Sequence, residues 1–134
     1  MNIERERLFI ETFVVRSKRD RYVTLLGNSK TRPKILGLLN HNLDVDWTLA
    51  IEAKTHDLAA LEAFLRSLGA PNEGCYFISD STELDGTTVS LGKALRLADD
   101  FFFASILDYV PGKLAVYWCE TATKPRCYVL LKKH

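Results

Sequence analysis

The sequence predicts an α+β fold, in which a helical N-terminal half packs on a mixed sheet of about four strands that ends in an antiparallel meander. Apolar residues recur at the period of an α-helix before residue 69, most clearly over residues 58–68. After residue 74 they instead form short runs that are bounded by turn residues. Helices followed by strands are typical of the α+β class.

Three helices are predicted before residue 43. The first covers residues 2–15, where apolar side chains share one face. The second opens after a Ser17 and Asp20 capping pair and ends at a Gly-Asn pair. The third has Pro33 in its first turn, a position that proline tolerates, and ends at residues 40–42.

The next segment, residues 43–55, has no decisive period, and we expect it to be irregular. A fourth helix follows it, with Thr55 as the N-cap and Gly69 at its C-terminal end. Its apolar face indicates that it lies on the sheet.

Four strands are expected in the second half of the chain. Residues 75–79 and 101–109 are joined by a helix over residues 90–98, which is the pattern of a crossover between parallel strands. Residues 114–120 and 127–133 continue as an antiparallel meander through two proline-containing turns.

We expect one domain over residues 1–134, because no low-complexity or linker-like stretch divides the chain. Three cysteines without C-x-x-C spacing indicate neither a disulfide framework nor a zinc site. A hairpin turn centred on Thr123 would place Cys119 opposite Cys127. The first residues carry paired charges where a signal peptide needs an apolar run, and no stretch has the length of a membrane span, so we expect a cytoplasmic protein.

Positive charge is concentrated in one segment, although the formal net charge is only +1. Residues 16–34 contain one acid, Asp20, and seven basic residues: Arg16, Lys18, Arg19, Arg21, Lys30, Arg32 and Lys34. Clustered cations create a local field that attracts anions. We therefore expect these residues to bind an acidic protein or nucleic acid, with solvated surface charge as the alternative.

An acidic loop follows the strand predicted over residues 75–79. Its hydroxyl and carboxylate side chains are hard oxygen ligands of the kind that Mg²⁺ and Ca²⁺ prefer: Asp80, Ser81, Glu83 and Asp85. The loop does not match the EF-hand pattern, because Gly92 stands where the bidentate glutamate belongs. It is a candidate ligand loop, and a plain solvated turn is the alternative.

A second group of acids precedes a Glu-x-Lys triplet. Asp44 and Asp46 followed by Glu52 and Lys54 resemble the site of PD-(D/E)xK nucleases, in which carboxylates hold Mg²⁺ and a lysine assists the attacking water. The resemblance covers only these residues, and no proline precedes either aspartate.

No other motif indicates chemistry. The three histidines stand in no recognisable relation to a serine or cysteine, and the chain has no Walker A or G-x-G-x-x-G loop. We therefore expect no cofactor. The leading hypothesis is a noncatalytic binding or regulatory module that contacts a macromolecule through its basic surface. The alternatives are a metal-dependent phosphodiesterase or nuclease that uses the clustered carboxylates, and a structural homo-oligomer that pairs through its last strand.

Overall fold

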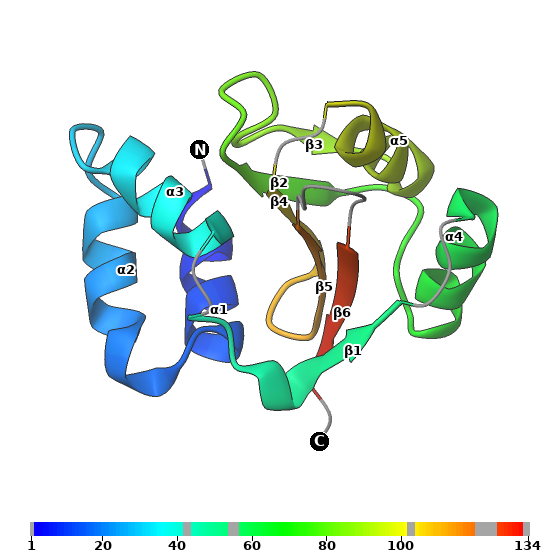
Figure 1. Ribbon diagram of the computed structural model, residues 1–134, viewed down its shortest axis with the longest axis horizontal. Helices are drawn as coiled ribbons and strands as arrows, with labels where there is room; N and C mark the ends of the chain where they lie inside the picture. The colour runs from blue at the N-terminus through cyan, green and yellow to red at the C-terminus, as the bar shows by residue number, and fades with distance from the viewer. Residues whose placement is uncertain (1, 42–43, 54–56, 102–103, 120–125, 133–134) are drawn as a thin grey trace.

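The computed structural model describes residues 2–41, 44–53, 57–101, 104–119 and 126–132 (Figure 1). In these residues the helices and 3-10 turns are α1 (Ile3–Phe13), η1 (Arg16–Lys18), α2 (Arg19–Leu26), α3 (Arg32–His41), η2 (Trp47–Leu49), α4 (Leu58–Ser67) and α5 (Leu91–Phe101). The strands are β1 (Ala50–Glu52), β2 (Cys75–Ser79), β3 (Thr88–Val89), β4 (Ser105–Val110), β5 (Leu114–Cys119) and β6 (Arg126–Leu131). None of the helices in the described residues is long and apolar enough to span a membrane.

The strands form one antiparallel sheet in the order β1-β6-β5-β4-β2-β3. Helices cover both faces of the sheet, α1 to α3 on one side and α4 with α5 on the other (Figure 1). The molecule therefore has three layers, with the sheet in the middle.

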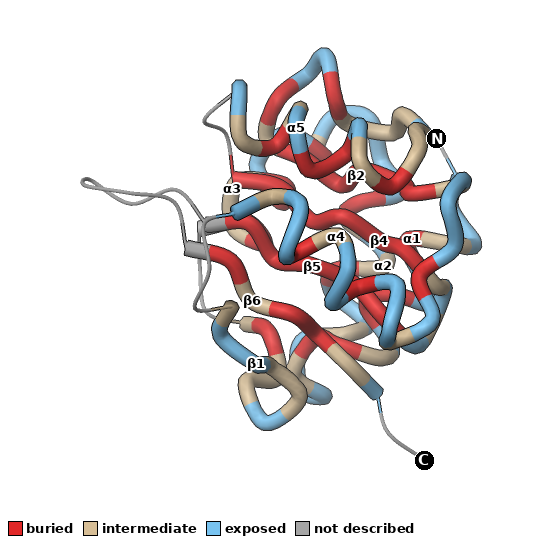
Figure 2. The backbone as a smooth tube through the Cα atoms, turned by 90° about the vertical axis from the view of Figure 1, so that its right-hand side faces the viewer, coloured by how far each residue is buried: buried red, intermediate tan, exposed pale blue. Residues whose placement is uncertain are grey.

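Each face of the sheet contributes to a separate hydrophobic core. Along β2, Cys75 and Phe77 pack in the core under α4 and α5, whereas Tyr76 and Ile78 pack in the core under α1 to α3. Successive side chains of a strand point to opposite faces, so both sets become buried. This explains why burial continues from residue to residue along β2 and β4 instead of alternating (Figure 2).

The α+β class is confirmed, but the sheet has six strands rather than four and is antiparallel rather than mixed. The expected parallel crossover from β2 to β4 is wrong, because Phe77 of β2 pairs antiparallel with Leu107 of β4. The two-residue strand β3 reverses the chain before α5 begins. Since β3 and β4 both run antiparallel to β2, α5 joins two mutually parallel strands that flank β2. A strand of two residues is too short to give a sequence pattern.

The segment expected to be irregular contains η2 and the edge strand β1. Ile51 of β1 pairs with Val129 of β6, so the last strand is an inner strand in the described sheet. This corrects the expectation that the last strand is the edge of the sheet, on which the hypothesis of a homo-oligomer pairing through that strand rested. The β5–β6 register is also offset from the expected one, because Cys127 lies opposite Trp118 and not opposite Cys119.

The helix ends agree only in part with the caps expected from the sequence. Asp57 caps α4 by accepting a hydrogen bond from the Ala59 amide, while the expected cap, Thr55, lies outside the described residues. Gly69 after α4 has φ of 101°, which is the left-handed conformation that favours glycine. The N-terminus of α2 has no side-chain cap, because η1 leads directly into it.

One arginine joins three separate segments on the α1 to α3 side of the sheet. Arg32 of α3 binds Glu6 of α1 through Nη1 to Oε1 at 2.7 Å and Nη2 to Oε2 at 2.8 Å. It also binds Asp85 of the β2–β3 loop through Nε at 3.0 Å and Nη2 at 3.1 Å, and the Leu26 carbonyl oxygen at 3.1 Å. All five N–H donors of the guanidinium are therefore used. Arg32 is 6% exposed and Glu6 is 3% exposed, so this is a buried ion-pair network.

A second ion pair extends this network onto the sheet. The Tyr76 hydroxyl donates to Oε2 of Glu6 at 2.6 Å and accepts from the Asn2 amide. Arg5, on the same helix as Glu6, donates to Oδ2 of Asp108 at 3.0 Å and to the Asp108 carbonyl oxygen at 2.6 Å. Oδ1 of Asp108 is buried and has no hydrogen-bond partner among the described residues.

The buried carboxyl of Asp108 binds a proton more tightly than an exposed one. Burial raises the pKa of Asp108 to about 6, although the guanidinium of Arg5 opposes the shift. The folded pKa lies above the unfolded one, so the stability that this group contributes is fully present below about pH 4. That stability is lost as the pH rises through about 6.

We expect Arg32→Met to lower the free energy of unfolding by about 3 to 5 kcal/mol, because it leaves two carboxylates without their cation in a buried position. The matched control is Arg66→Met, which removes the exposed pair with Glu62 on α4 and should cost less than about 1 kcal/mol. Arg32→Lys should recover only part of the loss, since an ammonium cannot supply five donors in a plane. Chemical denaturation measures all three, and similar losses for Arg32→Met and Arg66→Met would contradict the account.

For Asp108 we expect a pH-dependent effect of substitution. Asp108→Asn should gain stability relative to the wild type between pH 4 and pH 7, by up to about 3 kcal/mol, because the variant has no carboxylate to ionise in the core. Denaturation at a series of pH values measures the difference. A constant difference across this range would show that Asp108 titrates normally.

Candidate functional site

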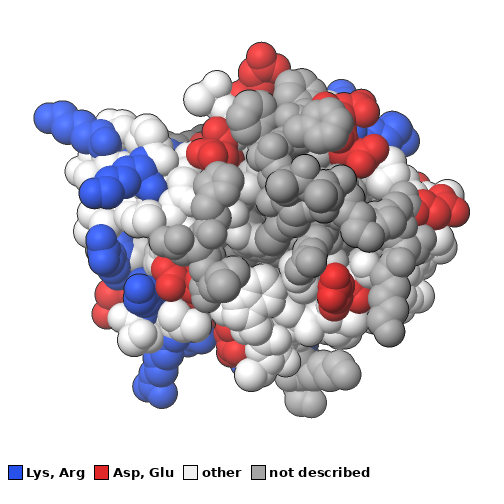
Figure 3. Space-filling model, in the orientation of Figure 1, with Lys and Arg blue, Asp and Glu red and all other residues white. Residues whose placement is uncertain are grey.

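The predicted basic residues lie on η1, on α2, and around the start of α3. Lys and Arg side chains gather along the edge of the molecule that α2 forms (Figure 3). Five of the seven are exposed, and we refer to them as the helical basic surface: Arg16, Lys18, Arg21, Lys30 and Lys34. Of these five, only Lys18 forms an ion pair within the described residues.

The other two predicted basic residues have internal roles. Arg32 is buried between Glu6 and Asp85, so it is not available to an external anion, which corrects its assignment to a binding surface. Arg19 is half-buried and donates from Nε to the Val14 carbonyl oxygen at 2.8 Å, beyond the end of α1. It fixes the α1–α2 connection.

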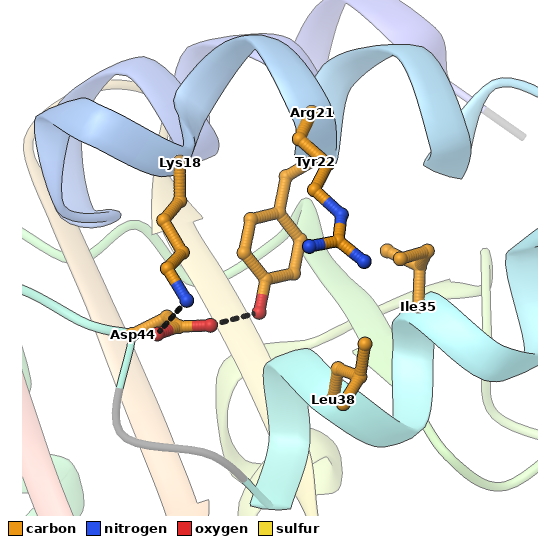
Figure 4. Close-up of a pocket in the computed structure, with 6 residues that line it drawn as sticks. All are labelled: Lys18, Arg21, Tyr22, Ile35, Leu38 and Asp44. Atoms are coloured by element: carbon orange, nitrogen blue, oxygen red, sulfur yellow. Dashed lines mark hydrogen bonds and ion pairs between the residues drawn. The ribbon is translucent and has the colours of Figure 1, made fainter.

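A pocket of about 180 Å³ opens between α2 and α3 within the helical basic surface. Figure 4 shows Lys18, Arg21 and Tyr22 reaching toward α3 from one side, while Ile35 and Leu38 of α3 form the opposite wall. The remaining lining residue is Asp44, which follows α3 in the chain.

Tyr22 and Asp44 close one end of the pocket. The buried Tyr22 hydroxyl donates to Oδ2 of Asp44 at 2.5 Å, and Nζ of Lys18 lies 3.5 Å from Oδ1. Burial, and then the hydrogen bond to Asp44, raise the pKa of Tyr22 above its ordinary value. The phenol therefore stays protonated near neutral pH and continues to donate to the carboxylate.

The charges of the pocket leave one cation without a partner. Asp44 accepts from Tyr22 and pairs with Lys18, whereas Arg21 forms no ion pair within the part of the chain that the structure describes. Two cations and one carboxylate give the pocket an excess of one positive charge next to the apolar wall of Ile35 and Leu38. Such a site can hold an anion beside an apolar group.

Sequence reasoning placed Lys18 and Arg21 in the basic surface, and it named Asp44 only as part of the nuclease-like pattern. Tyr22, Ile35 and Leu38 belong to the apolar faces of their helices, and the pattern does not reveal that part of each face lines an opening. Asp44 is 22 positions from Tyr22. The antiparallel bridge between Val14 and Val45, and the hydrogen bond from the Val15 amide to the Asp44 carbonyl oxygen, hold Asp44 close to α2.

The candidate ligand loop is held by internal contacts. Asp85 accepts from Arg32 and from the Ser79 amide, so its carboxylate faces the interior. Ser81 is buried, with its amide bound to the Ser79 hydroxyl. Glu83 is exposed and Asp80 is half-buried. No group of three or more His, Cys, Asp or Glu side chains among the described residues is arranged to hold a metal ion.

The second acidic group is also dispersed. Asp46 accepts from the amide and hydroxyl of Thr48 and so begins η2, and the Thr48 hydroxyl lowers the pKa of this carboxyl. Glu52 is exposed on β1, and Asp44 faces Lys18 and Tyr22 in the pocket. Lys54 lies outside the described residues. Asp44 and Asp46 thus have different partners, and the described residues of the nuclease-like pattern do not gather into one metal-binding group.

Comparison of this chain with protein-family models, with curated proteins and with solved structures finds no match.

A double-mutant cycle between Tyr22→Phe and Asp44→Asn tests the closed end of the pocket. We expect a coupling energy of about 1 kcal/mol or more in the free energy of unfolding, because the phenol donates to a charged acceptor. Each single variant is the control for the other. Additive losses would show that the two side chains do not interact.

Proposed function

We propose that this chain is a noncatalytic docking module of the cytoplasm that binds an acidic protein through the helical basic surface. The observation that supports the proposal is the concentration of five exposed cations on η1, α2, the α2–α3 turn and α3, four of them without an ion pair within the described residues. Elsewhere on the surface basic side chains have acidic partners, as Arg7 has in Glu4 and Glu11.

Unpaired surface cations favour association in two ways. Their summed field attracts an acidic partner before contact and raises the association rate. On contact, Arg16, Arg21 and Lys34 can pair with the partner's carboxylates without first breaking an ion pair within the described residues. Screening by salt weakens both effects.

An acidic protein fits this surface better than a nucleic acid. Asp20 is exposed on α2 between Arg19 and Arg21, and Asp44 lies in the pocket beside Lys18. A nucleic acid has a negative charge at every phosphate and would place some of these charges next to the two carboxylates. A folded partner can place neutral side chains there and acidic ones opposite the cations.

The experiment compares two double charge reversals. We expect Arg16→Glu with Lys34→Glu to weaken binding of a glutamate homopolymer by about tenfold or more, because two attractive charges become repulsive. The control, Lys93→Glu with Arg96→Glu, reverses two exposed charges on α5, in the opposite helical layer, and should change the dissociation constant by less than about twofold. Isothermal titration calorimetry at several salt concentrations measures both.

Equal binding by the two double variants, or binding that does not depend on salt, would refute docking through this surface. A single-stranded oligonucleotide that binds more tightly than the glutamate polymer at the same salt would assign the surface to nucleic acid instead.

A further inference from the structure

The pocket between α2 and α3 differs chemically from the rest of the helical basic surface. Its walls combine two cationic side chains, Lys18 and Arg21, with the apolar side chains of Ile35 and Leu38. Its volume of about 180 Å³ exceeds the roughly 150 Å³ of an engineered protein cavity that binds benzene. The pocket therefore has room for a branched aliphatic or six-membered group. A surface that only exposes its charges to water would need no such opening.

The contact between Lys18 and Asp44 is easily replaced. Nζ and Oδ1 are 3.5 Å apart, and the Lys18 side chain is 47% exposed. An exposed ion pair of this length contributes little to stability, so Lys18 can turn toward an incoming anion at small cost. The Tyr22 hydroxyl keeps one oxygen of Asp44 occupied while Lys18 moves.

Arg21 can bind that anion without first breaking an ion pair within the described residues. Its guanidinium extends from α2 toward the space between Tyr22 and Ile35 (Figure 4). A carboxylate can accept two parallel hydrogen bonds from an arginine, which a neutral amide cannot reproduce. A doubly charged phosphate would meet stronger repulsion from the carboxylate of Asp44.

We infer that this pocket is a binding site for a carboxylate on a compact apolar body, with the carboxylate between Lys18 and Arg21 and the apolar body against Ile35 and Leu38. The source of the carboxylate is either a free organic acid or an acidic side chain of the docked protein. The second source rests on the proposed docking function. In that case the pocket is the contact that makes docking selective.

The test uses 4-methylpentanoate as the probe and the neutral 4-methylpentanamide as its isosteric control, with binding followed by NMR titration of backbone amides. We expect the acid to shift amides of α2 and α3, and the amide analogue to bind at least about tenfold more weakly. Arg21→Gln should weaken binding of the acid by a similar factor. The matched variant, Arg16→Gln, removes an exposed arginine that does not line the pocket and should change the affinity by less than about twofold.

The glutamate homopolymer distinguishes the two sources. If Arg21→Gln weakens its binding clearly more than Arg16→Gln does, while the free acid does not bind, the pocket holds a partner's side chain. If the free acid binds as described, the pocket holds small carboxylates. The inference is overturned if neither probe depends on Arg21, or if the acid and its amide bind equally. The proposed docking function stands in that case as long as polymer binding still depends on Arg16 and Lys34, so the two failures are distinguishable.

Discussion

The ion-pair network around Arg32 is the constraint on which the arrangement of α1, α2 and α3 against the sheet depends. Its guanidinium uses all five donors, four of them on the carboxylates of Glu6 and Asp85 and one on a backbone carbonyl. These acceptors belong to α1, the end of α2 and the β2–β3 loop, while Arg32 itself begins α3. One side chain therefore fixes the positions of segments that are far apart in the sequence. Buried charges are costly unless every hydrogen-bonding group is satisfied, which restricts how these segments can pack.

This constraint also determines which residues remain for binding. Because Asp85 pairs with Arg32, the basic segment and the acidic loop neutralise each other at one point instead of forming two separate sites. The cations that remain exposed lie on the outer side of η1, α2 and α3. The pocket between α2 and α3 depends on the same packing, since the network fixes the start of α3 relative to α1 and the sheet. The interior thus sets the geometry of the proposed docking surface.

Local patterns predicted the helices well because their information is local. The apolar face of α4, the left-handed Gly69 and the proline at the start of α3 each act within a few residues. The sheet was predicted less well, because β1 and β3 have three and two residues and exist only through pairing with β6 and β2. The candidate site shows the same limit. Clustering in sequence indicated the basic surface, but it could not separate the buried Arg32 from the exposed Lys34, since that depends on Glu6 and Asp85.

The most direct test of this account is the NMR spectrum of the arginine side chains. If Arg32 is held by Glu6 and Asp85, its guanidinium cannot rotate freely, and its Nη protons should give separate, slowly exchanging signals at neutral pH. Arg16 is exposed and should give averaged, rapidly exchanging signals in the same spectrum. Loss of the separate Arg32 signals in Glu6→Gln would identify Glu6 as the residue that restrains it. Averaged Arg32 signals in the wild-type protein, indistinguishable from those of Arg16, would contradict the central role of the network.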